Sequence, residues 1–450
     1  MRFELTKKFL EDLRQAIESR DNPWIIENIH DLHFADIADL LDQLNNEEAK
    51  YVYFQLTEDV QADVLMELEE DVRDRFLKSL SSKEIADQLE NLDSDDAADI
   101  LGELSEKEIH EVISQMDDNE AADDIVELLN YDEDTAGGLM QKEFIQAKMD
   151  WPVSRCLVEL RRQAENVGNV YSIYVVDDLN KLVGLLSLKR LLFSDLKTQI
   201  RDLYKNKNVI SVKTTDSSEH VAKIMDKYDL VAIPVVDYQN KLVGRITFDD
   251  VVDIIKEEAD KDFQMASGIS DRIEASSSVW HISRARLPWL LIGMIGGIFA
   301  ANVIAGFTDQ ISHIPTLALF IPLITAMGGN VGVQSSAIVV QSIAKGNDQL
   351  DNILKKLSKE FSVGLLNGAF LALIIYGIAT LFGNATLGLV VSISLFVVII
   401  FAGIFGTLIP LLLNKYKIDP ALATGPFVTT LNDVLGLFIY FTVGVLLYHI

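Results

Sequence analysis

The sequence predicts a multi-domain membrane protein: an acidic all-α helical-repeat domain, an α/β pair of duplicated domains, a connecting helix and a five-helix transmembrane domain. Three observations predict it: a 12-residue apolar repeat in an acidic first third, an internal duplication, and long apolar segments near the end. A chain of 450 residues is long enough for several domains. The expected boundaries are 1–135, 136–200, 201–252, 253–286 and 287–450.

The first 135 residues carry all of the excess negative charge together with a regular apolar repeat. They hold 40 acidic and 11 basic side chains, a net charge of −29, whereas the rest of the chain holds 28 of each. Leucine or methionine recurs every 12 residues from Leu44 to Leu128, and another apolar residue lies three positions before each. This pattern predicts roughly eight short helices stacked as a solenoid. The carboxylates argue against a nucleic-acid partner, and they form either a solvated face or a surface that binds divalent cations.

The middle of the chain contains an internal duplication. Residues 171–192 recur at 231–252 with nine of the 22 positions identical. Each copy predicts two strands joined by a turn and then the start of a helix, and amphipathic helices are expected before them at 152–165 and 216–227. The pattern resembles a tandem pair of CBS domains, which implies one regulatory module that dimerises and takes an adenine nucleotide. No strong phosphate-cradling loop supports the nucleotide.

Acidic residues continue from the second copy into a predicted connecting helix. Asp250, Asp253, Glu257 and Glu258 recur at spacings of three to five residues, so they lie along one broad side of a helix. We expect this helix to continue to Arg284 at the membrane. A merely solvated acidic face and a role in transmitting regulation both fit this pattern.

Five apolar segments are each long enough to cross a bilayer. They are 287–307, 314–340, 361–382, 387–413 and 421–447. Lys and Arg precede the first segment and follow the second and fourth, whereas the connections 308–313 and 383–386 contain neither. The positive-inside rule therefore places the N-terminal domains in the cytoplasm, and an odd number of spans places the C-terminus outside. The charged N-terminus is no signal peptide, and the single Cys156 excludes an internal disulfide.

Two of these segments carry groups that suit a hard cation. Asp433 is the only ionisable side chain of the fifth segment, and a carboxylate in hydrocarbon is costly unless it faces a partner, a cavity or an ion path. Thr429 and Asn432 add oxygen donors, which Mg²⁺ prefers. In the second segment, the run Gly328-Gly329-Asn330 predicts a broken backbone that presents carbonyl oxygens to an ion. The alternatives are a protonated Asp433 hydrogen-bonded between helices and a flexible packing kink.

In this order the parts resemble the MgtE family of bacterial magnesium channels over essentially the whole chain. The motifs that carry the resemblance in the membrane segments are Pro322…Gly-Gly-Asn330-Val-Gly-Val-Gln334 and Asp419-Pro…Asn-Asp433. The resemblance implies a homodimer in the lipid bilayer, with one pore in which two copies of Asp433 hold a partly hydrated Mg²⁺ near Asn330. It also implies that the connecting helix is a plug and that Mg²⁺ bound to cytoplasmic acids regulates it. The acids of this sequence at the positions that match the family's pattern are Asp95, Asp99, Asp229, Asp250, Asp253, Glu257, Glu258, Asp262 and Asp419.

The favoured function is a Mg²⁺-selective uptake channel of the inner membrane, closed by cytoplasmic Mg²⁺ as negative feedback. A second hypothesis is a proton- or sodium-coupled carrier of divalent metals, with Asp433 as the coupling group. A third is a membrane-anchored Mg²⁺ sensor that conducts nothing, against which the predicted broken span argues. An enzyme is not expected, because the sequence shows no nucleophile–base pair or Walker loop and its seven His are scattered.

Overall fold

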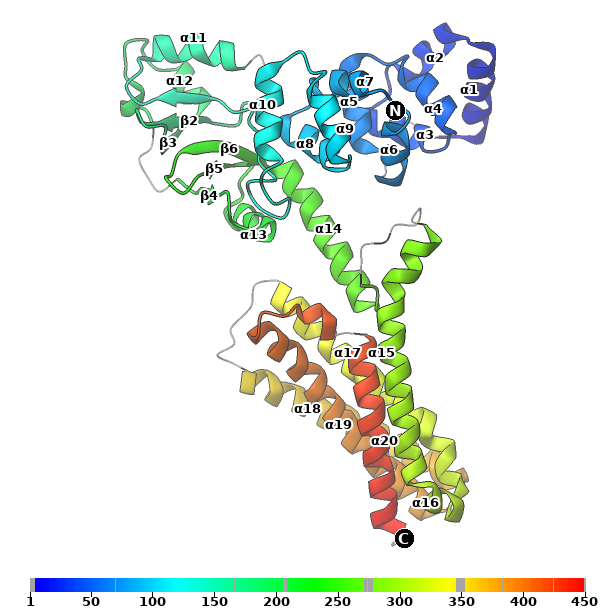
Figure 1. Cartoon of the computed structure of the whole chain (residues 1–450). Coiled ribbons are helices and arrows are strands. Elements are labelled where there is room, and N and C mark those ends of the chain that lie inside the picture. Colours follow the sequence, from blue (N-terminus) through cyan, green and yellow to red (C-terminus); the bar gives the residue numbers. More distant parts are fainter. Residues whose placement is uncertain are drawn as a thin grey trace. The chain divides into compact units, whose positions relative to one another are not determined.

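The computed structural model divides into two compact units, Met1–Lys256 and Glu257–Ile450, and the division falls inside helix α14 (Phe248–Ala266) (Figure 1). The structure describes all residues except 1–4, 69, 165–166, 205–208, 271–272, 274–277, 345–352, 383, 424 and 449–450.

The first unit begins with ten helices in its described part, and the last eight follow the 12-residue repeat. Two helices precede the repeat, α1 (Lys7–Ser19) and α2 (Asn22–Ile29). The repeat helices are α3 (Phe34–Leu41), α4 (Asn46–Tyr53), α5 (Glu58–Glu67), α6 (Glu70–Leu77), α7 (Ser82–Leu89), α8 (Ser94–Gly102), α9 (Glu106–Ile113) and α10 (Asn119–Leu128). The solenoid prediction is therefore confirmed, with two additional helices at its start.

The repeat specifies both the starts of these helices and their buried side. Asn45, Ser81 and Ser105 each begin a helix with a capping box, in which the side chains of the cap and of the third helical residue exchange hydrogen bonds with the backbone. The first apolar residue of most pairs, such as Leu65 or Leu101, is fully buried, whereas Ile113 is partly buried. Alternate helices pack together, as α3 does on α5 and α8 on α10, so the structural unit is a helix pair.

The duplicated region forms two three-stranded sheets of the same topology. The first contains β1 (Gln146–Lys148), β2 (Ile173–Val176) and β3 (Leu182–Leu186), and the second β4 (Val212–Lys213), β5 (Ala232–Val236) and β6 (Leu242–Thr247). In each sheet the first strand is parallel to the second, which forms an antiparallel hairpin with the third. The accompanying helices are α11 (Val153–Gln163), α12 (Leu188–Leu192), η1 (Ile200–Asp202) and α13 (Ser218–Tyr228).

The two hairpin turns of the duplication meet each other. Asn180 and Asn240 occupy the left-handed conformation, with φ of 59° and 62°, which Asn tolerates better than most residues. Leu182 N donates to the carbonyl oxygen of Asn240 at 3.1 Å, and Leu242 N donates to that of Asn180 at 3.0 Å. This reciprocal pairing confirms that the two copies form one module.

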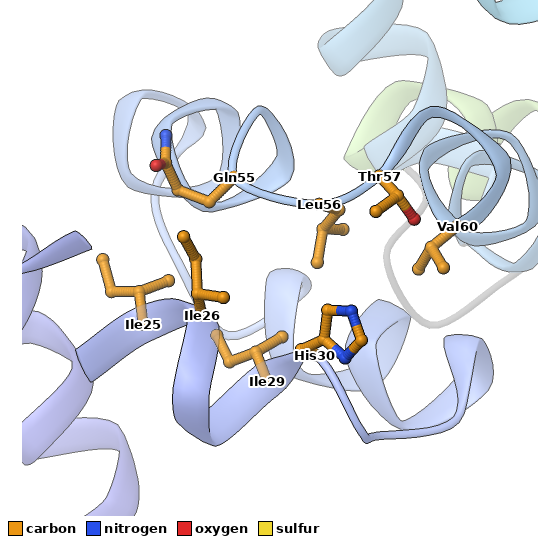
Figure 2. A pocket seen from close by; sticks show the side chains of 8 residues that line it. All are labelled: Ile25, Ile26, Ile29, His30, Gln55, Leu56, Thr57 and Val60. Carbon is orange, nitrogen blue, oxygen red and sulfur yellow. The ribbon is translucent and has the colours of Figure 1, made fainter. Parts of the chain in front are cut away.

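One apolar core joins the helical repeat to the second copy. It continues from Leu101 and Leu128 through Met140 to Ile233 and Val251. A hollow beside Ile29 and Leu56, between α2 and the α4–α5 turn, has a free volume of about 10 Å³ (Figure 2). Such a volume holds about one water molecule, so we interpret it as a packing gap rather than a ligand site.

Among its described residues, the second unit contains five helices that are long and apolar enough to cross a membrane, as predicted. Its elements are α15 (Val279–Gly306), α16 (Thr308–His313), η2 (Pro315–Phe320), α17 (Ile321–Ala344), α18 (Ile353–Phe382), α19 (Ala385–Lys415), η4 (Pro420–Ala423) and α20 (Pro426–Tyr448). Helix α19 is central, because it packs against α17, α18 and α20. Helices α15 and α20 also lie side by side (Figure 1).

The predicted break in the second membrane segment is wrong. Helix α17 runs without interruption through Gly328, Gly329 and Asn330, and the irregular backbone lies before it, in η2. The physical reason is close packing: a Cβ on Gly406 of α19 would overlap the carbonyl group of Gly332 in α17. These glycines let helices approach each other and do not unwind the backbone.

The expected ends of two other helices are also wrong. Helix α14 ends at Ala266, just before Gly268 adopts a φ of 82°, and α15 begins at Val279 behind a Ser278 cap. The connecting helix is therefore not continuous to Arg284, and residues 271–272 and 274–277 of the expected connector lie outside the described part. The last membrane helix begins at Pro426 rather than at 421, because a proline suits the first helical position.

Candidate functional site

Asp433 lies two turns into α20, at the crossing of this helix with the glycine face of α17. A Cβ on Gly329 would lie 3.0 Å from Thr429 Cγ2 and 3.7 Å from Asp433 Oδ1. Asp433 is half-buried, and no hydrogen-bond donor or cation pairs with it among the residues that the structure describes. The Thr429 hydroxyl donates to the carbonyl oxygen of Gly425 at 2.9 Å, which leaves its lone pairs available. The carboxylate is thus uncompensated beside other oxygen atoms.

The other predicted pore residues lie on two different sides of these helices. Asn432 is only 2 % exposed and lies against Gly332, and neither atom of its amide finds a hydrogen-bond partner within the described chain. A Cβ on Gly328 would be 3.6 Å from the carbonyl oxygen of Asn432, so Gly328 belongs to the same buried crossing. Asn330 is instead exposed on the outer side of α17. The structure therefore brings Thr429, Asp433 and Gly329 together but does not place Asn330 and Asn432 on the same side.

A second acidic residue lies in the membrane helices, Glu360, and it was not predicted as a site residue. It lies two turns into α18, where its carboxylate accepts a hydrogen bond from Ser335 of α17 at 2.5 Å. The expected third segment began at residue 361, so Glu360 fell one residue outside. An acidic residue directly before an apolar run is the signal that would have identified it.

In the first unit, acidic residues gather between the start of α8 and the start of α14. Asp95 is 6 % exposed; its Oδ2 accepts from Gln141 Nε2 at 3.3 Å, and its Oδ1 has no partner in the described chain. Burial raises the pKa of Asp95 well above its ordinary value, and Asp96 and Asp250 raise it further. The structure thus brings two predicted regulatory residues, Asp95 and Asp250, into electrostatic contact.

The same cluster contains residues that were not predicted as ligands. Burial, followed by the charge of Asp250, raises the pKa of Asp96 to about 8, and Asp99 also contributes. The pKa of Asp250 is raised by burial, although the Thr247 hydroxyl donates to its Oδ2 at 2.5 Å. Arg245 supplies a buried positive charge and donates to Gln141 Oε1 at 2.7 Å. Burial raises the pKa of Asp93, and the charge of Arg245 only partly opposes this rise. The other ionisable side chains named in this cluster are all carboxylic acids.

The remaining predicted regulatory acids are more dispersed. Asp229 is the exposed C-cap of α13, and Asp419 accepts from the backbone N–H of Ala421 at 2.8 Å. On α14, Asp253 pairs with Lys256 at 2.8 Å. The other acids predicted on this helix are Glu257, Glu258 and Asp262. Over the described ranges, no three His, Cys, Asp or Glu side chains converge closely enough to hold a metal ion.

The end of α14 contacts the start of α20. A Cβ on Gly425, whose φ is 59°, would lie 2.5 Å from the carbonyl oxygen of Ala266. A Cβ on Gly268 would lie 2.8 Å from Pro426 Cγ. We call the contact of Ala266 and Gly268 with Gly425 and Pro426 the glycine clasp. It joins the last turn of α14 to the helix that carries Asp433.

Comparisons with known families match four stretches of the chain. The profile of the family described as a divalent cation transporter, MgtE, matches residues 321–443. The MgtE intracellular N domain matches residues 32–134, and CBS domains match 136–197 and 200–257.

The chain is also similar to individual relatives and solved structures. It is 34 % identical to the magnesium transporter MgtE of Bacillus subtilis (strain 168), covering 72 % of this chain and 71 % of that one. It is 37 % identical to that of Enterococcus faecalis (strain ATCC 700802 / V583), covering 71 % and 70 %. The crystal structure of the soluble part of a magnesium transporter aligns with a TM-score of 0.50 at 31 % identity, covering 56 % of this chain and 99 % of that one. The cytosolic domain of the Mg²⁺ channel MgtE in complex with ATP aligns with a TM-score of 0.51 at 32 % identity, covering 54 % and 99 %. This chain, with its helical repeat, CBS pair and five apolar helices, therefore belongs to the MgtE family of magnesium transporters.

Proposed function

We propose that this protein is a Mg²⁺-selective channel for magnesium uptake, in which Asp433 contacts the transported ion. The observation that carries the proposal is the uncompensated Asp433 carboxylate beside Thr429 and Gly329, between two membrane helices. Leaving a charge without a partner inside a membrane is costly. A divalent cation in transit would offset that cost, and the neighbouring oxygen donors suit Mg²⁺.

Two subunits would enclose the path. Asn330 and Gln334 place exposed amides on the outer side of α17, and amides that face lipid lack hydrogen-bond partners. A homodimer that buries this side around water would satisfy both amides and bring two Asp433 side chains together. By the distribution of Lys and Arg, the N-terminal domains would be cytoplasmic and the C-terminus outside.

Cytoplasmic Mg²⁺ would close the channel through the acidic cluster and the connecting helix. Burial raises the pKa of Asp95, Asp96 and Asp250, and the charges of neighbouring carboxylates raise it further. A hydrated Mg²⁺ that bridges a pair of these carboxylates would stabilise the arrangement that binds it. Glu258 and Asp262 on α14, together with Asp419 near α20, would bind Mg²⁺ in the same way. Helix α14 begins at this cluster and ends at the glycine clasp, so it can transmit the change to α20.

An adenine nucleotide is a second proposed ligand of the CBS pair. The proposal is supported by the similar cytosolic domain whose structure is described in complex with ATP. Calorimetric titration of the full-length protein with ATP tests it, and no heat of binding at millimolar ATP would contradict it.

Magnesium flux into proteoliposomes tests the role of Asp433. Asp433→Ala and Asp433→Asn should both abolish Mg²⁺ uptake, because each removes the charge that faces the ion, while the purified dimer remains folded. Thr442→Ala is the matched control, since the Thr442 hydroxyl only donates to the Phe438 carbonyl of the same helix. Full uptake by the Asn variant would contradict a path in which charge selects the ion.

A further inference from the structure

Glu360 lies where α18, α17 and α19 meet. Its Oε1 accepts from the hydroxyl of Ser335, which is 3 % exposed, at 2.5 Å. A Cβ on Gly403 of α19 would lie 3.1 Å from the same oxygen, so Gly403 leaves the space that the carboxylate occupies. Gly364, one turn later on α18, lies against Ile400 in the same way. Glu360 therefore belongs to a close-packed helix crossing.

No cation compensates Glu360 within the described residues. Lys355, Lys356 and Lys359 lie on the same helix, but the partner of the Glu360 carboxylate in the described part of the chain is the Ser335 hydroxyl. A carboxylate at such a place is costly, and a neutral residue would pack there at lower cost. The bond from Ser335 falls in the length range of charge-assisted O–H···O⁻ bonds, which are about twice as strong as neutral ones.

This bond acts on the helix that forms one wall of the proposed path. Ser335 follows Gly332, which contacts both Gly406 and the side chain of Asn432. Ser335 and Asn330 are five residues apart, or about 140° around a helix. Holding Ser335 against α18 therefore keeps Asn330 on the outer side of α17 and Gly329 beside Asp433.

We propose that Glu360 is a positioning residue for magnesium transport, which fixes the rotation of α17 through its hydrogen bond to Ser335. Glu360 need not touch the ion. The role rests on the proposed path along α17 and α20. It adds a determinant of ion selectivity, because a rotated α17 would change the distance between Asn330 and Asp433.

The test measures Mg²⁺ and Ca²⁺ flux through the full-length protein in proteoliposomes. Ser335→Ala and Glu360→Ala should each lower the ratio of Mg²⁺ to Ca²⁺ flux by about tenfold, which is typical for loss of a hydrogen bond to a charged group. The double variant should be no worse than either single one, because both remove the same bond. Glu360→Gln should keep most of the wild-type ratio of Mg²⁺ to Ca²⁺ flux, because its amide oxygen can still accept the hydrogen bond from Ser335. Ser362→Ala, at an exposed serine of α18, is the matched control.

Several results would overturn the proposal. They are a wild-type ratio in Ser335→Ala, additive losses in the double variant, or a Glu360→Gln variant as impaired as Glu360→Ala, which would mean that the charge acts on the ion. The flux ratio does not depend on the fraction of protein that folds, so poor expression cannot imitate the expected result. Asp433→Asn distinguishes the two proposals: full transport by that variant rejects the path, whereas the Ser335–Glu360 cycle reports on positioning alone.

Discussion

At the scale of single residues, substitution of Asn330 tests whether the outer side of α17 belongs to the ion path. Asn330→Ala should lower Mg²⁺ flux several-fold, because it removes an exposed oxygen donor one residue from Gly329. Gln341→Ala, also exposed but near the end of the same helix, should have little effect. Equal and small effects in proteoliposome flux would restrict the path to the residues beside Asp433.

The raised pKa of Asp96 predicts how the stability of the first unit depends on pH. Its pKa rises from 3.8 to about 8 on folding, so the folded protein binds more protons than the unfolded chain between these values. Stability should therefore fall as pH rises from about 4 to 8. Mg²⁺ should reduce the fall, because it binds the ionised carboxylates. In EDTA, thermal unfolding of the intact protein should occur at lower temperature at pH 8 than at pH 6, and Asp96→Asn should reduce the difference. A melting temperature that rises over this range would contradict the raised pKa.

At the scale of elements, the glycine clasp should couple α14 to α20. Gly425→Ala and Gly268→Ala should each lower the free energy of unfolding by about 1–3 kcal/mol, because both positions have positive φ. The added methyl group would also meet the carbonyl oxygen of Ala266 in the first variant and Pro426 in the second. We expect both variants to conduct Mg²⁺ but to close at a shifted Mg²⁺ concentration. Gly377→Ala in α18 is the control, since nothing lies within 4 Å of its Cβ position. Unchanged melting temperature and unchanged closure in both clasp variants would exclude the coupling.

Periodic patterns predicted most elements, whereas local breaks were predicted poorly. The 12-residue repeat around Leu65 and Leu101 and the copied hairpins around Asn180 and Asn240 recur often enough to specify their helices and strands. The end of α14 depends on one backbone angle at Gly268, which no periodicity reports. The glycines near Gly329 fit both an unwound and a tightly packed helix, and only the contact of Gly332 with α19 distinguishes these two possibilities.

The candidate sites also contain residues that the sequence identifies and residues that only the fold brings together. Asp433 was identified because a charge in an apolar segment stands out in the sequence. The burial of Asn432 and the bond from Ser335 to Glu360 depend on helices distant in sequence, so the sequence alone could not place them. The cluster of Asp95, Asp96 and Asp250 likewise needs the fold, which brings α8 to the start of α14.

At the scale of the whole molecule, the charge distribution suits a Mg²⁺-dependent closure. A net charge of −29 in the first 135 residues opposes close packing of the acidic parts. Monovalent salt screens charges over roughly 8 Å, so it cannot neutralise carboxylates in direct contact, whereas bridging divalent cations can. Closure should therefore follow the Mg²⁺ concentration rather than the ionic strength.

Voltage-clamp recording of the purified protein in a planar bilayer tests this account most directly. A Mg²⁺ channel should carry a current that reverses at the Mg²⁺ equilibrium potential whatever the proton or sodium gradient. Millimolar Mg²⁺ on the side of the N-terminal domains should close it, and Na⁺ of equal ionic strength should not. A reversal potential that moves with the proton or sodium gradient would instead indicate a coupled carrier, and a current that persists at high Mg²⁺ would contradict the feedback.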